Sequence, residues 1–131
     1  MLEQKYIDYF PVDYLPFHIF VETVVDNYDG LKIFMKGKDQ EDPILEIFFH
    51  EKILYRNIDE SYFCRTIDSA SAQRSSPFVL VENSQLLKWF HEESYEIYKG
   101  DDIKHYLFFS GNDCIDVLSS SQPQVRCISK K

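Results

Sequence analysis

Residues 103–110 of this chain read Ile-Lys-His-Tyr-Leu-Phe-Phe-Ser. In a strand, alternate side chains point to opposite faces, so the segment divides into two sets: His105, Leu107 and Phe109 on one face, and Lys104, Tyr106 and Phe108 on the other. Both sets are largely apolar. The segment is therefore predicted to be an interior strand of a sheet.

The chain just before this strand predicts a second buried strand and a helix. Residues 78–81 form a short, continuous apolar run, which is typical of a central strand buried on both faces. Asn83 or Ser84 then supplies a side-chain oxygen that can cap a helix. At about 100° per residue, one half of that helix is apolar, and its members are Leu86, Leu87, Trp89, Phe90, Ile97 and Tyr98. We expect one main helix near residues 84–98, ended by Gly100.

The first half of the chain reads as a series of strands and turns. Alternating apolar side chains predict strands at residues 17–25, 31–36, 44–50 and 53–58, with turn chemistry around Gly30 between the first two. Residues 114–118 and 125–128 add shorter strand candidates. Residues 62–67 fit a short helix or a strand, and the polar run 68–77 is predicted to be a mobile surface loop. The expected fold is α+β: a mainly antiparallel meander of about six to eight strands with that one helix.

Composition sets the size and the charge of the protein. The 131 residues match one globular domain spanning residues 1–131. Eleven Phe, nine Tyr and one Trp accompany a net charge of −8. Scattered basic residues and an acidic excess disfavour nucleic acid and anionic membranes as partners and are compatible with a basic protein partner. The aromatic residues either fill a core or form a contact surface.

The first residues of the chain, its apolar segments and its cysteines indicate where in the cell the protein is expected. The first ten residues lack a basic region followed by an apolar run, so no secretory signal is expected. No segment has the roughly 18 apolar residues that cross a bilayer. Cys64, Cys114 and Cys127 are odd in number and widely spaced, which favours reduced thiols and a cytoplasmic protein.

Catalytic motifs are missing from the sequence. Segments starting at His50 and His91 resemble the first part of a zinc-protease helix, but Leu54 and Tyr95 stand where the second histidine is required. With four glycines in the chain, nucleophile elbows and phosphate loops are absent too. The sequence favours a non-catalytic protein and predicts no metal and no cofactor, although convergence of the four histidines in space stays open.

Two clusters are candidates for recognition. Arg56 and Arg65 flank Asp59 and Glu60, and either form ion pairs with them or, together with Tyr62, bind an anionic group or a partner. The helix offers a second cluster whose aromatic side chains either cover the sheet or anchor an interface. The candidate interface residues are Arg56, Tyr62, Arg65, Trp89, Tyr95 and Tyr98.

Several short segments resemble small bacterial proteins classed as domains of unknown function. The resemblance spans about half of the chain and is carried by Leu45-Glu46-Ile47, residues 55–60, residues 81–84, Lys88-Trp89-Phe90 and His105-Tyr106. Because that group has no established activity, the resemblance implies a bacterial, cytoplasmic origin and assigns no functional residue.

Three functions fit these observations. The first is a non-catalytic interaction module, such as an immunity- or antitoxin-like inhibitor that covers a basic partner with an acidic, aromatic surface. The alternative is a small-molecule-binding or enzymatic domain with an aromatic-lined pocket between sheet and helix, with His50, His91 or His105 among its polar groups. The third is self-association, in which the aromatic surplus forms a contact between copies.

Overall fold

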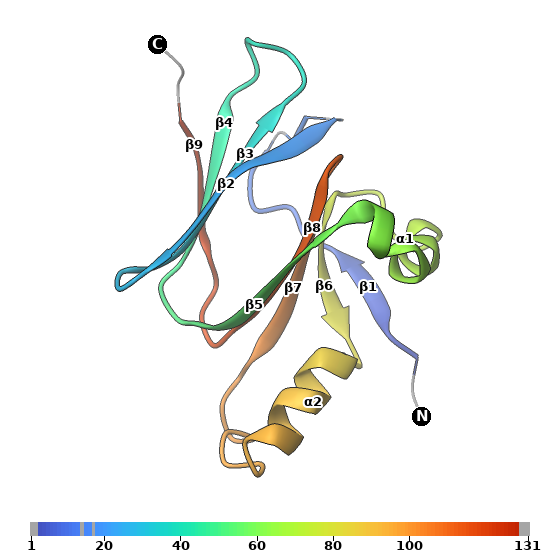
Figure 1. Cartoon of the computed structure of the whole chain (residues 1–131), viewed down its shortest axis with the longest axis vertical. Helices are drawn as coiled ribbons and strands as arrows, with labels where there is room; N and C mark the ends of the chain where they lie inside the picture. Colours follow the sequence, from blue (N-terminus) through green and yellow to red (C-terminus); the bar gives the residue numbers. More distant parts are fainter. Residues whose placement is uncertain (1–2, 14, 17, 129–131) are drawn as a thin grey trace.

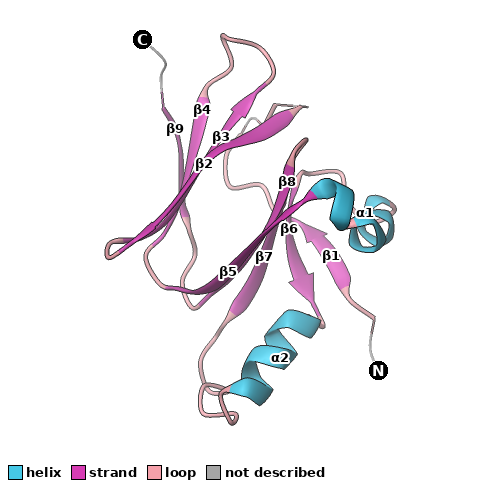
Figure 2. Ribbon diagram, in the orientation of Figure 1, coloured by secondary structure: helices cyan, strands magenta, loops and turns pink. Residues whose placement is uncertain are grey.

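Two antiparallel sheets stacked on one another make up most of the computed structural model, which describes residues 3–13, 15–16 and 18–128 (Figures 1 and 2). The larger sheet has the strand order β1-β6-β7-β8-β5, with β1 (Lys5–Asp8), β5 (Lys52–Asp59), β6 (Phe78–Glu82), β7 (Lys104–Phe109) and β8 (Asp113–Ser119). The smaller has the order β2-β3-β4-β9, with β2 (Ile19–Asn27), β3 (Gly30–Gly37), β4 (Ile44–Phe49) and β9 (Gln124–Ile128).

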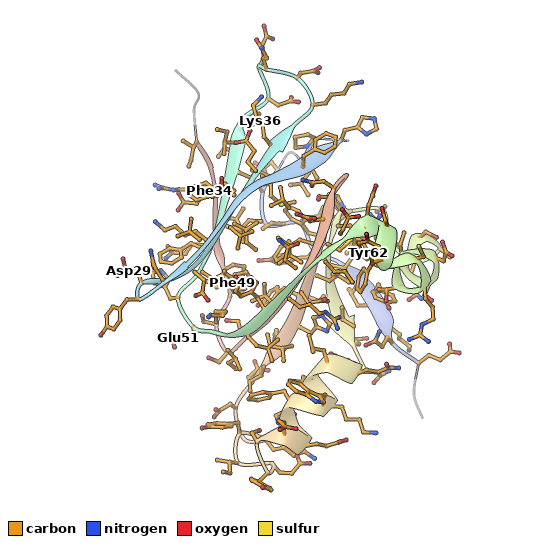
Figure 3. The ribbon with its side chains drawn as sticks, viewed as in Figure 1. Asp29, Phe34, Lys36, Phe49, Glu51 and Tyr62 are labelled. Carbon is orange, nitrogen blue, oxygen red and sulfur yellow. The ribbon has the colours of Figure 1, made fainter. Side chains whose placement is uncertain are left out.

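The main core lies between the two sheets. Its aromatic centre consists of edge-to-face ring pairs, with centroids 5.2 Å apart for Phe49 and Tyr106 and 4.9 Å apart for Phe78 and Phe108. In Figure 3 the labelled Phe49 lies between the sheets and the labelled Tyr62 lies beside the first helix. Apolar side chains of both sheets surround the rings: Ile19, Leu31, Ile33, Met35, Leu45, Ile47, Ile115 and Val117.

The outer face of the larger sheet carries a second, smaller core. Helix α1 (Cys64–Ser71) packs there through the fully buried Ala70, close to Leu107 and Phe109 of β7. Strand β7 lies between β6 and β8 and is covered on both faces. The sequence prediction of an interior strand at this segment is therefore confirmed.

The helical content differs from expectation. The part of the chain that the structure describes holds nine strands and two short α-helices rather than six to eight strands and one main helix. Helix α2 (Gln85–Glu93) ends five residues before position 98, because the backbone turns left-handed at Tyr95 and Glu96 and a right-handed helix cannot continue through that conformation. Helix α1, following a single 3₁₀ turn at Glu60–Tyr62, occupies the start of the run 68–77 that was expected to be a loop.

The strand prediction needs two further corrections. Strand β5 leaves the meander and pairs with β8 in the other sheet, and β1 has no counterpart in the prediction. A pairing irregularity between Lys52 and Leu54 marks the point at which the chain changes sheets. Alternation of apolar residues is the same in either sheet, so the sequence pattern could not reveal the change. Phe17, the first residue of the predicted strand 17–25, lies outside the described residues.

Neither α1 nor α2, nor any other helix among the described residues, has the length and apolar character needed to cross a membrane.

Replacing Phe49 with alanine tests the core. We expect Phe49→Ala to lower the free energy of unfolding by about 3–5 kcal/mol, because it opens a cavity beneath Tyr106 and Phe108. Tyr28→Ala, at the fully exposed β2–β3 turn, is the matched control and should change it by less than about 0.5 kcal/mol. Urea unfolding measures both, and equal effects would contradict the assigned core.

The three thiols provide a second test. Cys64 and Cys127 are exposed, whereas Cys114 is buried beneath α1, and this burial raises the pKa of the Cys114 thiol to about 11. A thiol with a raised pKa remains protonated and unreactive near neutral pH. Ellman's reagent should therefore titrate two thiols in the folded protein and the third after unfolding. Fast reaction of all three would contradict this burial.

Candidate functional site

An open pocket of about 910 Å³ lies on the outer face of the larger sheet, between α1 and α2. Strands β6, β7 and β8 form its floor, and β1 and β5 close its sides. The lining residues are mixed in character: apolar or aromatic Tyr6, Ile58, Tyr62, Phe63, Val81, Leu86, Trp89 and Leu107; charged or titratable Glu3, Arg56, Arg65, His105 and Asp116; and neutral polar Gln4, Thr66, Ser69, Gln73 and Gln85. Its volume is that of a site for a small molecule or a few side chains.

A chain of buried polar side chains lies at the floor of this pocket. The Nδ1 atom of His105 is 2.7 Å from the Ser84 hydroxyl, and its Nε2 is 2.6 Å from Oδ1 of Asp116. All three residues are buried, and Asp116 is fully so. They come from the start of α2, from β7 and from β8, so the chain of bonds joins three elements.

Arg56 extends this chain to the pocket surface. Its Nε and Nη2 atoms lie 2.8 and 2.7 Å from Oδ2 of Asp116, and its guanidinium lies over the ring of Phe63 at 5.6 Å. The side chain of Arg56 is 48% exposed, against 1% for Asp116. A buried carboxylate thus holds a half-exposed cation in one orientation.

The hydrogen-bond partners allow a consistent placement of the protons along the chain. Ser84 is the N-cap of α2, and its oxygen accepts from the Leu87 amide at 3.0 Å. The Ser84 hydroxyl can then donate to Nδ1 of His105, while Nε2–H donates to the carboxylate of Asp116. In this assignment, a neutral histidine satisfies every partner in the chain.

The Ser84–His105–Asp116 series has the residue types of a hydrolase triad but not the setting of one. A nucleophile must face bound substrate, whereas Ser84 is 8% exposed and does not line the pocket. Its oxygen is also engaged in capping α2. These three residues are therefore assigned to positioning Arg56 and tying α2 to the sheet.

The six candidate interface residues fall into two groups. Arg56, Tyr62, Arg65 and Trp89 all line the pocket. Tyr95 and Tyr98 lie beyond α2. The structure thus places Trp89 of the second cluster in the same pocket lining as the three residues of the first cluster, whereas Tyr95 and Tyr98 lie in the segment that follows α2.

Arg56 and Arg65 do not bind the acidic pair between them. Arg56 pairs with Asp116, and no ion pair joins Arg65 to another residue in the described part of the chain. Asp59 instead accepts from the Ser61 amide at 2.8 Å and caps the 3₁₀ turn, which lowers its pKa. The ion-pair alternative offered by the sequence is wrong for both arginines.

The segment after α2 carries the remaining two candidates, and we call it, together with Glu92 and Glu93 at the end of the helix, the acidic turn (residues 92–102). Tyr95 and Glu96 adopt φ of 54° and 61°, a left-handed conformation that residues other than glycine rarely adopt. The Glu96 amide closes the helix end by donating to the His91 carbonyl at 2.8 Å. This backbone leaves Tyr95 87% and Ile97 71% exposed, while Tyr98 stacks on Phe90.

The acidic turn is also strongly charged. It contains five acidic side chains and one lysine. Lys99 pairs with Glu96, and Lys104 outside the turn pairs with Asp102, both at 3.3 Å and both at the surface. An excess of negative charge therefore surrounds the exposed Tyr95 and Ile97.

The histidines do not converge. His105 lines the pocket, His91 lies on α2, and His50 follows β4 with Nε2 3.4 Å from Gln124; His18 is exposed just before β2. Within the described residues, no group of three or more His, Cys, Asp and Glu side chains is placed to hold a metal ion.

Sequence reasoning missed Ser84, His105 and Asp116 as one unit. Asp116 stands in the apolar run 114–118, and a lone acid in a buried strand is a signal for a paired carboxylate. The partner of Asp116 could not be deduced, because the register of β7 and β8 comes from the fold. This register sets Leu107 opposite Asp116 and leaves His105 two residues from Leu107 on the same face.

No protein-family model, curated protein or solved structure matches this chain.

Replacing Asp116 with asparagine tests the buried chain. We expect Asp116→Asn to reduce the free energy of unfolding by about 2–4 kcal/mol, since it leaves Arg56 without a counter-charge and removes a charged acceptor from His105. Asp102→Asn removes the exposed partner of Lys104 and should cost less than about 1 kcal/mol. If the two variants lose similar amounts of unfolding free energy in thermal or urea unfolding, the buried pair contributes no more to stability than the exposed pair.

Proposed function

We propose that this protein is a non-catalytic interaction module that binds a basic partner protein through α2 and the acidic turn. The proposal places it among small inhibitors of the immunity or antitoxin type, whose acidic surface covers a basic partner. One observation carries it: the left-handed backbone at Tyr95 and Glu96 holds two large apolar side chains, Tyr95 and Ile97, in solvent.

The backbone geometry supports a functional reason for this exposure. A left-handed residue other than glycine costs about 1–2 kcal/mol, and such residues occur preferentially at binding sites. Glycine would remove the cost at Tyr95, because a side chain that is 87% exposed stabilises the fold little. A tyrosine at this position therefore weakens the folded state without a compensating contact inside the protein.

The charge around these side chains supports a basic partner. Trp89, Tyr95 and Ile97 are exposed beside five acidic residues of the turn. Aromatic side chains provide most of the binding energy of many interfaces, and opposite charge accelerates the encounter of two proteins. The rest of the chain, with its net charge of −8, adds to that attraction.

Tyr95→Gly separates binding from stability. We expect the variant to gain about 0.5–1 kcal/mol in unfolding free energy, because glycine relieves the left-handed strain, and to lose the captured partner. The measurement combines urea unfolding with affinity capture from a lysate of the source organism and mass-spectrometric identification. Loss of binding by a more stable variant cannot result from misfolding.

The control is Tyr28→Ala, which removes another exposed tyrosine, from the β2–β3 turn. It should retain the partner, and the association rate with the purified partner should fall as salt rises. A captured protein that is acidic, that binds Tyr95→Gly with unchanged affinity, or that associates at a salt-independent rate would refute the proposal.

A further inference from the structure

The pocket between α1 and α2 shares Trp89 with the proposed interface but has further features that the interface does not use. Arg56 directs a half-exposed guanidinium toward it, and Arg65 lines it without an ion pair in the described part of the chain. Tyr62, Phe63 and Trp89 add aromatic surface. We propose that this pocket binds an organic monocarboxylate with a planar apolar body, with Arg56 and Arg65 holding the carboxylate.

The geometry of Arg56 supports a bound anion. A guanidinium has five N–H donors, and Asp116 accepts from Nε and Nη2 alone. The Nη1 edge remains available on a side chain that is 48% exposed. With the ring of Phe63 at 5.6 Å on one side and Asp116 behind, the guanidinium is fixed before any ligand arrives, which lowers the entropy cost of binding.

The buried side chains behind Arg56 support a functional role for this arrangement. Burying Asp116 and His105 is expensive, and apolar residues of similar size often give equal or greater stability. The chain from Ser84 to Asp116 fixes the position of the arginine, because Ser84 is held by α2 and His105 by β7. We therefore attribute the arrangement to ligand binding at Arg56 rather than to stability.

The charge balance of the lining disfavours a ligand with two negative charges. Arg56 and Arg65 line the pocket together with Asp116 and Glu3, so the formal charges of the lining cancel. A single carboxylate can accept from the two arginines in the fork geometry that guanidinium groups favour. A phosphate dianion would carry a second negative charge toward Glu3 and Asp116.

The remaining lining selects the body of the ligand. Gln4 and Gln73 are engaged within the protein, since Gln4 accepts from the Gln85 amide and Gln73 from the Tyr6 amide. The lining offers the rings of Tyr62 and Trp89 and the apolar floor at Leu107 for contact with a ligand. A volume of about 910 Å³ accepts an aromatic ring with a short acid side chain. Binding of such a ligand does not require the basic partner protein.

The single tryptophan of the chain, Trp89, lines this pocket and reports binding directly. The probes are 3-phenylpropanoate, its neutral amide 3-phenylpropanamide, and the dianion 2-phenylethyl phosphate. We expect a saturable change of tryptophan fluorescence with the carboxylate and affinities about tenfold or more weaker for the other two. Equal or tighter binding of the amide or the phosphate, or no saturable change with the carboxylate, would overturn the inference.

Variants locate the carboxylate. Arg65→Gln should weaken binding of 3-phenylpropanoate about tenfold or more, whereas Lys88→Gln, an exposed position on α2 outside the lining, should leave it unchanged. Arg56→Gln should abolish binding of 3-phenylpropanoate. If this variant fails to fold, the affinity of Arg65→Gln still tests whether the arginines bind the carboxylate. Unchanged affinity in Arg65→Gln would refute the role of the arginines. Loss of the partner in Tyr95→Gly with retained carboxylate binding would separate this inference from the proposed interface.

Discussion

The structure depends on the burial of β7 on both faces. Tyr106 and Phe108 point into the core between the sheets, while Leu107 and Phe109 point to the other side and need a second cover. The four-stranded sheet provides the first cover, and α1 provides part of the second. Burial of apolar surface is the main favourable term in folding, and aromatic side chains contribute large areas to it, so the layered arrangement follows from this one strand.

The pocket is a consequence of incomplete cover on the outer face. Helices α1 and α2 lie at opposite ends of it, and the sheet between them carries His105 and Asp116 in place of apolar residues. Polar groups that are buried without water must satisfy one another, and they do so through Ser84 and Arg56. The same bonds attach α2 to the sheet and orient the arginine, so stability and site geometry are linked.

Helix α2 also connects the pocket to the acidic turn. Trp89 lines the pocket, and the strained residues Tyr95 and Glu96 follow shortly after the end of the helix at Glu93. A ligand that contacts Trp89 and a partner that contacts Tyr95 would therefore act on one short helix. The hydrogen bond between Ser84 and His105 attaches α2 to β7 and limits how far the ligand or the partner can displace the helix.

Three features follow from the sequence alone: the antiparallel, strand-rich class, the interior strand at 103–110 and the capping of a helix near Ser84. These features are local, because they follow from side-chain alternation and from capping within a few residues. The tertiary structure alone decided that the strands form two sheets, that α2 stops at Glu93, and that Asp116 meets His105 and Arg56. Each of these depends on strand register or on the left-handed backbone at Tyr95 and Glu96, and a register shift of one residue would move Asp116 to the opposite face.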